Sequence, residues 1–241
     1  MNTDRTEVAA LSAARERVLG RIAEACARVG RDPADVTLVA VSKTVPVERL
    51  LSAVAAGLDV LGENRVQEAA RKVGQVPGAV WHLVGPLQSN KARRAVELFD
   101  VIGSVDSIDL ARRLDRLAAE IRPGRPLPVL VQVNVDADPA KAGFAPAHLE
   151  AALPALLALP ALDLRGCMTI GRLVGSADEA RPTFAALREL SARLRERQPL
   201  LGLDLSMGMS DDYEVAVEEG ATIVRVGRAL FGERPHEHDH G

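Results

Sequence analysis

Short apolar runs alternate along the chain with longer segments that carry charges at helical spacing. Residues 36–41, Val-Thr-Leu-Val-Ala-Val, are apolar almost throughout, as expected for a strand that is covered on both faces. Segments 47–56, 108–121 and 178–197 contain helix formers with charges recurring on one side. The pattern predicts eight strands: residues 36–42, 59–63, 80–85, 101–105, 128–135, 164–170, 203–207 and 222–226.

The order of these elements predicts the fold class. Strands that are buried on both faces and separated by helices form a parallel sheet, and eight strand–helix units suit a closed (β/α)8 TIM barrel. An additional helix over residues 6–29 precedes the first strand. An open doubly wound sheet is the alternative, but the chain has no GxGxxG turn to favour it. We expect one α/β domain over residues 1–241, with the leading helix within 1–30 and a disordered tail at 233–241.

Composition and charge narrow the class of partner. Lys and Arg total 30 against 33 for Asp and Glu, so the net charge of -3 provides no broad positive field for a nucleic-acid backbone. The polar start of the chain is followed by no apolar segment of the kind that signal peptides carry. The most apolar stretch, residues 151–162, is too short to cross a bilayer. We expect a cytoplasmic protein that binds neither nucleic acid nor a membrane.

The two cysteines favour no metal or disulfide chemistry. Cys26 and Cys167 lie far apart without CxxC spacing, which suits reduced, buried thiols. The histidine-rich stretch at 236–240 permits weak metal capture but falls in the expected disordered tail. We therefore expect no specific metal site. The polar helical shell favours a monomer.

A lysine and an arginine are predicted at the carboxyl ends of strands, where barrels carry their sites. By the two-residue alternation of a strand, Val39, Val41 and Lys43 share a face, which puts Lys43 at the rim of the barrel interior. Arg225 and Gly227 share the inward face of the last strand in the same way. Two long cations are thus expected to face the interior together.

The loops after the seventh and eighth strands are where such barrels bind phosphate. The seventh strand is followed by Ser206-Met-Gly-Met-Ser210, whose small residues let N–H groups and hydroxyls approach an anion. Ser210 is also placed to cap a helix that begins at Asp211. These residues predict a phosphate cup.

Together the three features match the needs of pyridoxal phosphate: an amine for its aldehyde, donors for its phosphate and a partner for its pyridine nitrogen. Each has an ordinary explanation when taken alone. A lysine at a strand end is usually a surface side chain, Ser206–Ser210 also suits core methionines before a helix cap, and Arg225 also suits half of an internal ion pair. The combination favours a cofactor site.

At these residues the chain resembles the pyridoxal phosphate homeostasis protein family, whose members look like the barrel domain of alanine racemase without its second domain. The matching motifs span nearly the whole chain. They are LVAVSK at 38–43, GEN at 62–64, VQE at 66–68, WHLVGPLQSNK at 81–91, VQVN at 131–134, KAG at 141–143, LSMGMSDD at 205–212, VRVG at 224–227 and LFG at 230–232.

The resemblance implies pyridoxal 5'-phosphate as the cofactor and assigns residues around its ring. Lys43 holds the cofactor as a Schiff base, Arg225 lies near the pyridine nitrogen, and Asn64 sits close to the ring. An arginine beside the pyridine nitrogen keeps that nitrogen unprotonated, which makes the ring a poor electron sink. We therefore expect binding without substantial turnover and assign no catalytic residue.

The resemblance also implies a phosphate site formed by Ser206, Gly227 and the backbone of Arg228. Many family members have Thr or Ser where this chain has Arg228, so a hydroxyl contact to the phosphate is lost here while the backbone N–H remains. This departure concerns one contact of the cup.

A second base is missing from the predicted site. Racemases with such an arginine use two bases, a lysine and a tyrosine, on opposite faces of the substrate. The only tyrosine, Tyr213, is expected on a helix surface or at the rim. With no second domain to cover it, the site should be open and poor at committing a substrate to reaction.

Three functions remain at this point. The leading one is a cytoplasmic buffer and carrier that takes part in pyridoxal phosphate homeostasis and delivers the cofactor to apoenzymes that depend on it. The second is a pyridoxal-phosphate-dependent amino-acid racemase or decarboxylase of the alanine racemase fold type. The third is a cofactor-free Schiff-base aldolase that acts on a phosphorylated sugar. We interpret His82 as a core or rim residue, and Lys141 as a candidate for holding a second anion.

Overall fold

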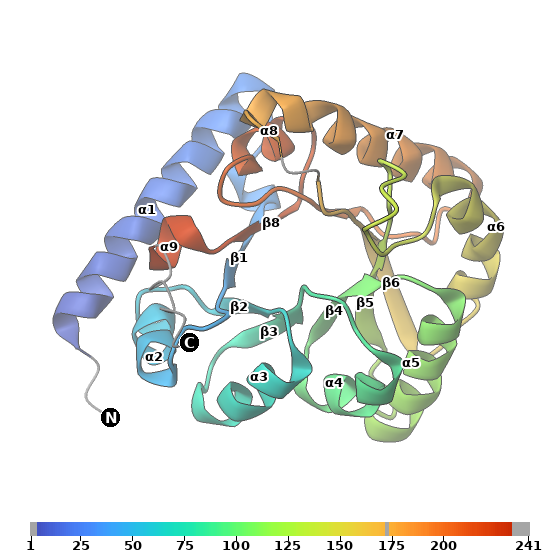
Figure 1. Cartoon of the computed structure of the whole chain (residues 1–241), viewed down its shortest axis with the longest axis horizontal. Coiled ribbons are helices and arrows are strands. Elements are labelled where there is room, and N and C mark those ends of the chain that lie inside the picture. Colours follow the sequence, from blue (N-terminus) through green and yellow to red (C-terminus); the bar gives the residue numbers. More distant parts are fainter. Residues whose placement is uncertain (1–3, 172–173, 233–241) are drawn as a thin grey trace, which may run out of the picture.

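The computed structural model describes residues 4–171 and 174–232, in which eight parallel strands close into a barrel in chain order (Figure 1). The strands are β1 (Thr37–Val41), β2 (Val60–Glu63), β3 (Val80–Leu83), β4 (Val101–Val105), β5 (Leu127–Gln132), β6 (Leu162–Met168), β7 (Asp204–Ser206) and β8 (Ile223–Val226). Because β1 pairs with β8, with Val39 opposite Arg225, the sheet has no edge. The predicted (β/α)8 TIM barrel is confirmed, and the open sheet is excluded.

Helices surround the barrel. They are α1 (Arg5–Arg28), α2 (Val47–Ala55), α3 (Val66–Lys72), α4 (Ala92–Leu98), α5 (Ile108–Ile121), α6 (Pro146–Leu157), α7 (Arg181–Arg197), α8 (Tyr213–Glu218) and α9 (Arg228–Phe231). Short 3₁₀ turns cover Pro33–Asp35, Val73–Gln75, Ser89–Lys91 and Ala177–Ala180. No helix in the described ranges is long and apolar enough to cross a membrane.

The predicted leading helix is present as α1. Asp4 caps it by accepting a 2.9 Å hydrogen bond from the Thr6 N–H. Its buried face, with Leu11, Val18 and Ile22 among others, packs on α2, α8 and α9. Since α9 has only four residues, α1 covers the side of the barrel next to β8 and β1 (Figure 1). The predicted tail at 233–241 lies outside the described residues.

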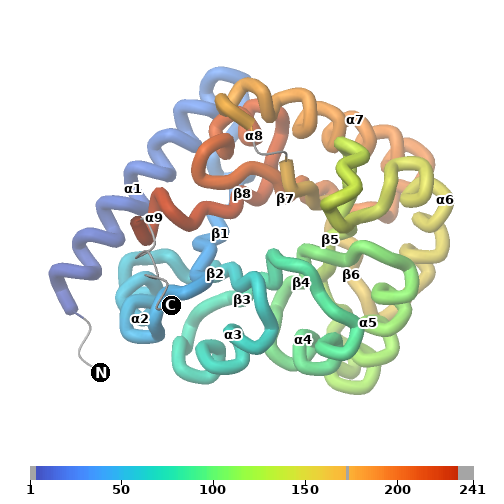
Figure 2. The backbone as a smooth tube through the Cα atoms, in the orientation of Figure 1, coloured from blue at the N-terminus to red at the C-terminus, as the bar shows by residue number. Residues whose placement is uncertain are grey.

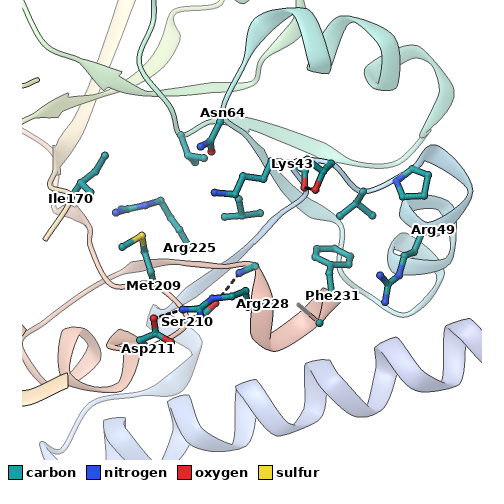
Figure 3. A pocket seen from close by; sticks show the side chains of 17 residues that line it. Lys43, Arg49, Asn64, Ile170, Met209, Ser210, Asp211, Arg225, Arg228 and Phe231 are labelled. Atoms are coloured by element: carbon teal, nitrogen blue, oxygen red, sulfur yellow. Dashed lines mark hydrogen bonds and ion pairs between the residues drawn. The ribbon is translucent and has the colours of Figure 1, made fainter. Parts of the chain in front are cut away.

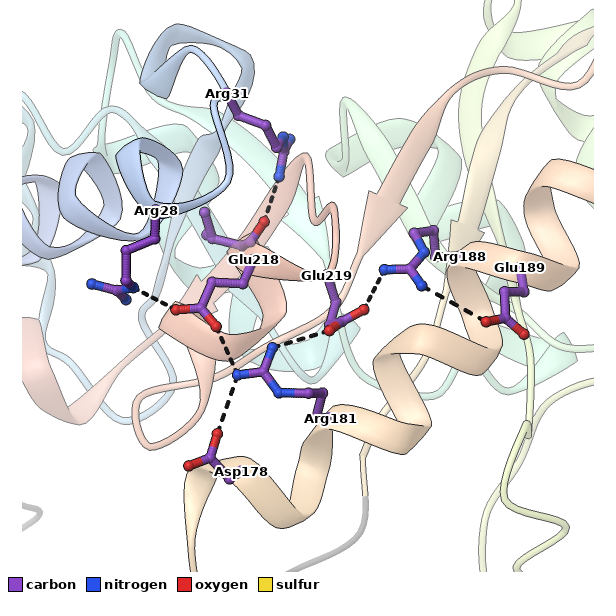
Figure 4. Close-up of polar contacts among 9 residues, drawn as sticks. Arg28, Arg31, Asp178, Arg181, Arg188, Glu189, Glu218 and Glu219 are labelled. Atoms are coloured by element: carbon purple, nitrogen blue, oxygen red, sulfur yellow. Dashed lines mark hydrogen bonds and ion pairs between the residues drawn. The ribbon is translucent and has the colours of Figure 1, made fainter.

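Charged side chains join α1 and α7 to α8 (Figure 4). Glu218 accepts hydrogen bonds from Arg28 at 2.6 Å and from Arg181 at 2.7 Å. Glu219 accepts from Arg181 at 3.0 Å and also pairs with Arg188. These contacts fix α8, which directly follows the loop after β7, to the outer ring of helices.

The core has two parts. Most buried apolar side chains lie between the strands and the helices, including Val224 and Val226 of β8. A smaller cluster of Val39, Leu130, Met168 and Ile223 fills the inside of the ring that Figure 2 shows. The alternation along β8 therefore directs Arg225 inward, as predicted from the sequence.

Candidate functional site

A cavity of about 480 Å³ opens at the carboxyl ends of the strands (Figure 3). Segments after β1, β2, β7 and β8 contribute most of its polar wall. Its lining residues are Val41, Lys43, Thr44, Val45, Pro46, Arg49, Asn64, Val84, Ile170, Met209, Ser210, Asp211, Arg225, Gly227, Arg228, Phe231 and Gly232. Five of the six predicted cofactor-binding residues thus line one cavity. The sixth, Ser206, is not among the lining residues.

Lys43 lies in a tight turn after β1. The Val45 N–H closes the turn by donating to the Ser42 carbonyl at 3.0 Å. Thr44 has φ of 65°, a conformation that β-branched residues rarely adopt, and its hydroxyl donates to the Lys43 carbonyl at 2.6 Å. In Figure 3 the Lys43 side chain extends into the cavity, with Asn64 and Arg225 nearby.

Arg225 rises from β8 into the same cavity and is 5 % exposed. It donates to the Ser206 hydroxyl at 2.7 Å and to the Thr169 carbonyl at 2.8 Å. Burial lowers the pKa of Arg225 to about 10, and attraction to Asp212 opposes that shift. The guanidinium therefore stays protonated at neutral pH.

Ser206 is 3 % exposed and is not one of the residues that line the cavity. Because its hydroxyl accepts from Arg225, its place in the structure is beside the guanidinium. Contact with a phosphate, which the resemblance implied, remains a prediction for this residue. The lining set includes Ser210 instead.

The loop after β7 corrects the predicted helix start. The helix begins at Tyr213, and Ser210 does not cap it. The Ser210 hydroxyl accepts from the Gly227 N–H at 3.2 Å, while the Met209 N–H donates to the Asp212 carboxylate at 2.6 Å. Ser210 was expected at a helix start because it precedes two aspartates, but the loop turns it toward the β8 end. It thereby ties the two loops of the predicted phosphate cup together.

Tyr213 was expected at a helix surface or at the rim, and this was wrong. It is only 2 % exposed and does not line the cavity. Helix α8 is covered by α1, which comes from the other end of the chain, so its aromatic side chain is enclosed. Burial raises the pKa of Tyr213, with Glu214 contributing, so its hydroxyl stays protonated at neutral pH and does not act as a base.

The remaining candidates lie away from the cavity wall. His82 is buried, as predicted, and burial lowers its pKa to about 4. Lys141 donates to the Ile170 carbonyl at 3.2 Å and lies within 4 Å of Asp136 and Asp138. Its role toward a second anion stays a prediction.

Both cysteines are buried and unpaired, as expected from their spacing. Burial raises the pKa of Cys167 to about 12 and also raises that of Cys26, so neither is a reactive thiolate. The described residues contain no group of three or more metal-ligating side chains. Residues 236–240, the other metal candidate, lie outside the described ranges.

Sequence reasoning missed a buried charged group next to the Lys43 turn. It consists of Glu63, Glu68 and Lys72, and pairs at the i,i+4 spacing of Glu68 and Lys72 are common on exposed helix surfaces. The available signal was a carboxylate at the end of an apolar strand, because a charge there needs a buried partner.

The family model described as alanine racemase, N-terminal domain, matches residues 19–235. The pyridoxal phosphate homeostasis protein of Pseudomonas aeruginosa is 47% identical over 225 residues, which cover 91% of this chain and 94% of that protein.

Solved structures of other proteins have a similar barrel. PipY of Synechococcus elongatus with pyridoxal phosphate bound is 48% identical, with a TM-score of 0.77, and the match covers 88% of this chain and all of that one. Alanine racemase of Clostridium difficile shares the fold with a TM-score of 0.69 at 16% identity, over 91% of this chain and 60% of the racemase.

Proposed function

Because the chain belongs to the pyridoxal phosphate homeostasis protein family, built on the alanine racemase N-terminal domain, we propose that it binds pyridoxal 5'-phosphate through Lys43 and buffers it for delivery to apoenzymes. The observation that carries the proposal is the meeting of Lys43, Asn64 and Arg225 at one cavity.

The residues present fit this group. The cofactor supplies an aldehyde that condenses reversibly with a lysine amine. Lys43 provides that amine, and Arg225 is placed to face the pyridine nitrogen. The Ser210 hydroxyl and the backbone of Gly227 and Arg228 line the same cavity and would hold the phosphate. A cavity of about 480 Å³ is large enough for a ligand of this size.

We propose holding rather than turnover because the cavity offers no second base of the racemase kind. None of its described lining residues is a tyrosine or a histidine. Arg225 is positively charged, whereas stable protonation of the pyridine nitrogen would need a carboxylic acid side chain beside it. Tyr213 is enclosed under α1. These features disfavour the racemase or decarboxylase alternative, and similarity to a cofactor-bound relative disfavours the cofactor-free aldolase.

Borohydride reduction tests binding. The purified protein should be yellow, and reduction should remove the visible band and leave a phosphopyridoxyl mass on Lys43. Lys43→Ala should show neither. Absence of colour and of the added mass would contradict the proposal. Amino-acid turnover by the loaded protein, lost in Lys43→Ala, would restore the racemase or decarboxylase alternative.

A mixing assay tests delivery. The loaded protein should reactivate a pyridoxal-phosphate-dependent apoenzyme faster than the same concentration of free cofactor. Equal rates would be consistent with storage of the cofactor and would contradict its directed delivery. We also propose that the protein is a monomer in the cytoplasm, which sedimentation and cell fractionation test.

A further inference from the structure

A charged group, the Lys72 cluster, contacts the Lys43 turn and consists of the buried Glu63 and Lys72 and the partly exposed Glu68. The Lys72 Nζ is 2.8 Å from Glu63 Oε1 and 2.7 Å from Glu68 Oε1. The Glu63 side chain is fully buried and that of Lys72 is 8% exposed. None of the three lines the cavity. Burying the charges of Glu63 and Lys72 is costly, so their pairing is weak evidence of a stabilising role.

The cluster holds the backbone on both sides of Lys43. On one side, the Lys72 Nζ donates to the Ser42 carbonyl at 2.8 Å. On the other side, the Thr44 N–H donates to Glu68 Oε1 at 2.6 Å. These two groups belong to the two peptide bonds that flank Lys43, so both of its peptide planes are fixed by charged partners.

Ser42 adds a third contact. Its hydroxyl donates to Glu63 Oε1 at 2.6 Å, and its side chain is buried. Ser42, which directly follows β1, is therefore joined to Glu63, the last residue of β2. The turn cannot rotate without breaking hydrogen bonds to charged groups, which are stronger than neutral ones.

The conformation of Thr44 shows what these contacts oppose. With φ of 65° this β-branched residue occupies a region that is strained for it. The hydrogen bond from its N–H to Glu68 is one of the contacts that hold it there. If that contact were lost, relaxation of Thr44 would rotate the neighbouring peptide and redirect the Lys43 side chain.

We propose that the Lys72 cluster is a positioning device that aims the Lys43 amine into the cavity. The inference rests on the proposed function, because it concerns the same lysine. Glu63, Glu68 and Lys72 are positioning residues that act through the backbone of the Lys43 turn. A purely structural role, in which the cluster only holds α3 against β2, is the competing explanation.

Two substitutions separate these explanations, and each removes the contact on one side. Glu68→Leu removes the acceptor for Thr44, and Lys72→Met removes the donor to Ser42. Glu68→Gln is the conservative partner because its amide oxygen can still accept from Thr44. Leu153→Ala, in α6 and remote from the cavity, is the control for lost stability, since Leu153 is 1% exposed.

The measurement is the rate at which the visible band appears when protein freed of cofactor is mixed with pyridoxal phosphate. We expect Glu68→Leu and Lys72→Met to slow it about tenfold, as small misplacements of a reacting group do. Glu68→Gln should stay within about twofold of the unaltered protein. Leu153→Ala should lower the thermal midpoint without slowing the reaction.

A second probe keeps this test separate from that of the proposed function. Salicylaldehyde, which has no phosphate, is trapped on lysines with borohydride, and labelling of Lys43 is compared with that of Lys91 by mass spectrometry. Slower labelling of Lys43 in Glu68→Leu supports positioning even if pyridoxal phosphate itself fails to bind. Unaltered rates with both aldehydes in Glu68→Leu and Lys72→Met would overturn the inference.

Discussion

The Arg225 guanidinium donates a 2.7 Å hydrogen bond to the Ser206 hydroxyl inside the barrel. The Ser206 oxygen, which the resemblance assigned to phosphate, thus accepts from the arginine, and its own O–H stays available to donate to another acceptor. Ser206→Ala should leave a buried guanidinium N–H without this partner and cost about 1–3 kcal/mol of unfolding free energy. The preference for pyridoxal phosphate over pyridoxal should stay within about twofold.

Ser210→Ala is the matched comparison, because Ser210 lines the cavity. In Ser210→Ala the preference for pyridoxal phosphate over pyridoxal should fall about tenfold, as expected for loss of a hydrogen bond to a charged group. Titration of both ligands against both variants, followed by absorbance, checks the pair. A larger loss in Ser206→Ala than in Ser210→Ala would show that Ser206 contacts the phosphate.

Gly208 allows the loop after β7 to pack closely on α8. Its φ is 89°, and an added Cβ would lie 2.5 Å from the Ala216 Cβ. Its carbonyl also accepts from the Arg225 N–H at 3.0 Å. Gly208→Ala should cost more than about 2 kcal/mol of unfolding free energy and weaken cofactor binding.

Gly20 provides the control for Gly208. It lies within α1, and an added Cβ there would meet nothing within 4 Å. Gly20→Ala should stabilise the protein by about 0.5–1 kcal/mol, since Ala is the better helix former. Denaturant titration measures both changes. Equal effects of the two substitutions would contradict the packing argument.

His82 should make stability fall in mild acid. Burial lowers its pKa from 6.5 to about 4, so the unfolded chain binds a proton in that window and the folded protein does not. The contribution is fully present above pH 6.5 and is lost as the pH falls toward 4. It amounts to about 3 kcal/mol of unfolding free energy.

His82→Leu removes this titration and checks the sign. Unfolding free energies measured at pH 7 and pH 4 should differ less in the variant than in the unaltered protein. The same pH dependence in both would assign the acid sensitivity to carboxylates instead.

Arg228 brings a cation to the cavity mouth, where it pairs with Asp211. Both side chains are more than half exposed, so Arg228→Thr should change unfolding free energy by less than about 1 kcal/mol. The affinity for pyridoxal phosphate should become less sensitive to salt, because one screened attraction is removed. Titrations at low and high salt test this, and an unchanged salt dependence would show that Arg228 does not reach the phosphate.

The sequence predicted the barrel well because its signals are local. Residues 101–105 and 108–121 were assigned with the bounds that β4 and α5 have, since each has a clear hydrophobic period and a polar turn between them. The fifth strand ends at Gln132 instead of residue 135, because Val133 pairs with Phe144 across a long loop. That pairing leaves no trace in a local pattern.

The site was predictable where strand alternation directs a side chain inward, as at Arg225 in β8, and Lys43 reaches the same cavity from the turn that follows β1. Tyr213 and Lys72 were missed for a different reason. The environment of Tyr213 is made by α1, about two hundred residues earlier, and that of Lys72 by the Ser42 carbonyl and Glu63. Burial that depends on distant segments cannot be derived from the period of a short helix.

The contacts of helix α1 influence the order in which parts of the protein can fold during synthesis. Part of its apolar face packs on the early helix α2, but its other partners, α8 and α9, include residues 213–231. During translation that other part of the face stays uncovered until nearly the whole barrel has left the ribosome. Closure of the ring, which joins β1 to β8, therefore brings together strands from the two ends of the barrel sequence and is expected to be a late step.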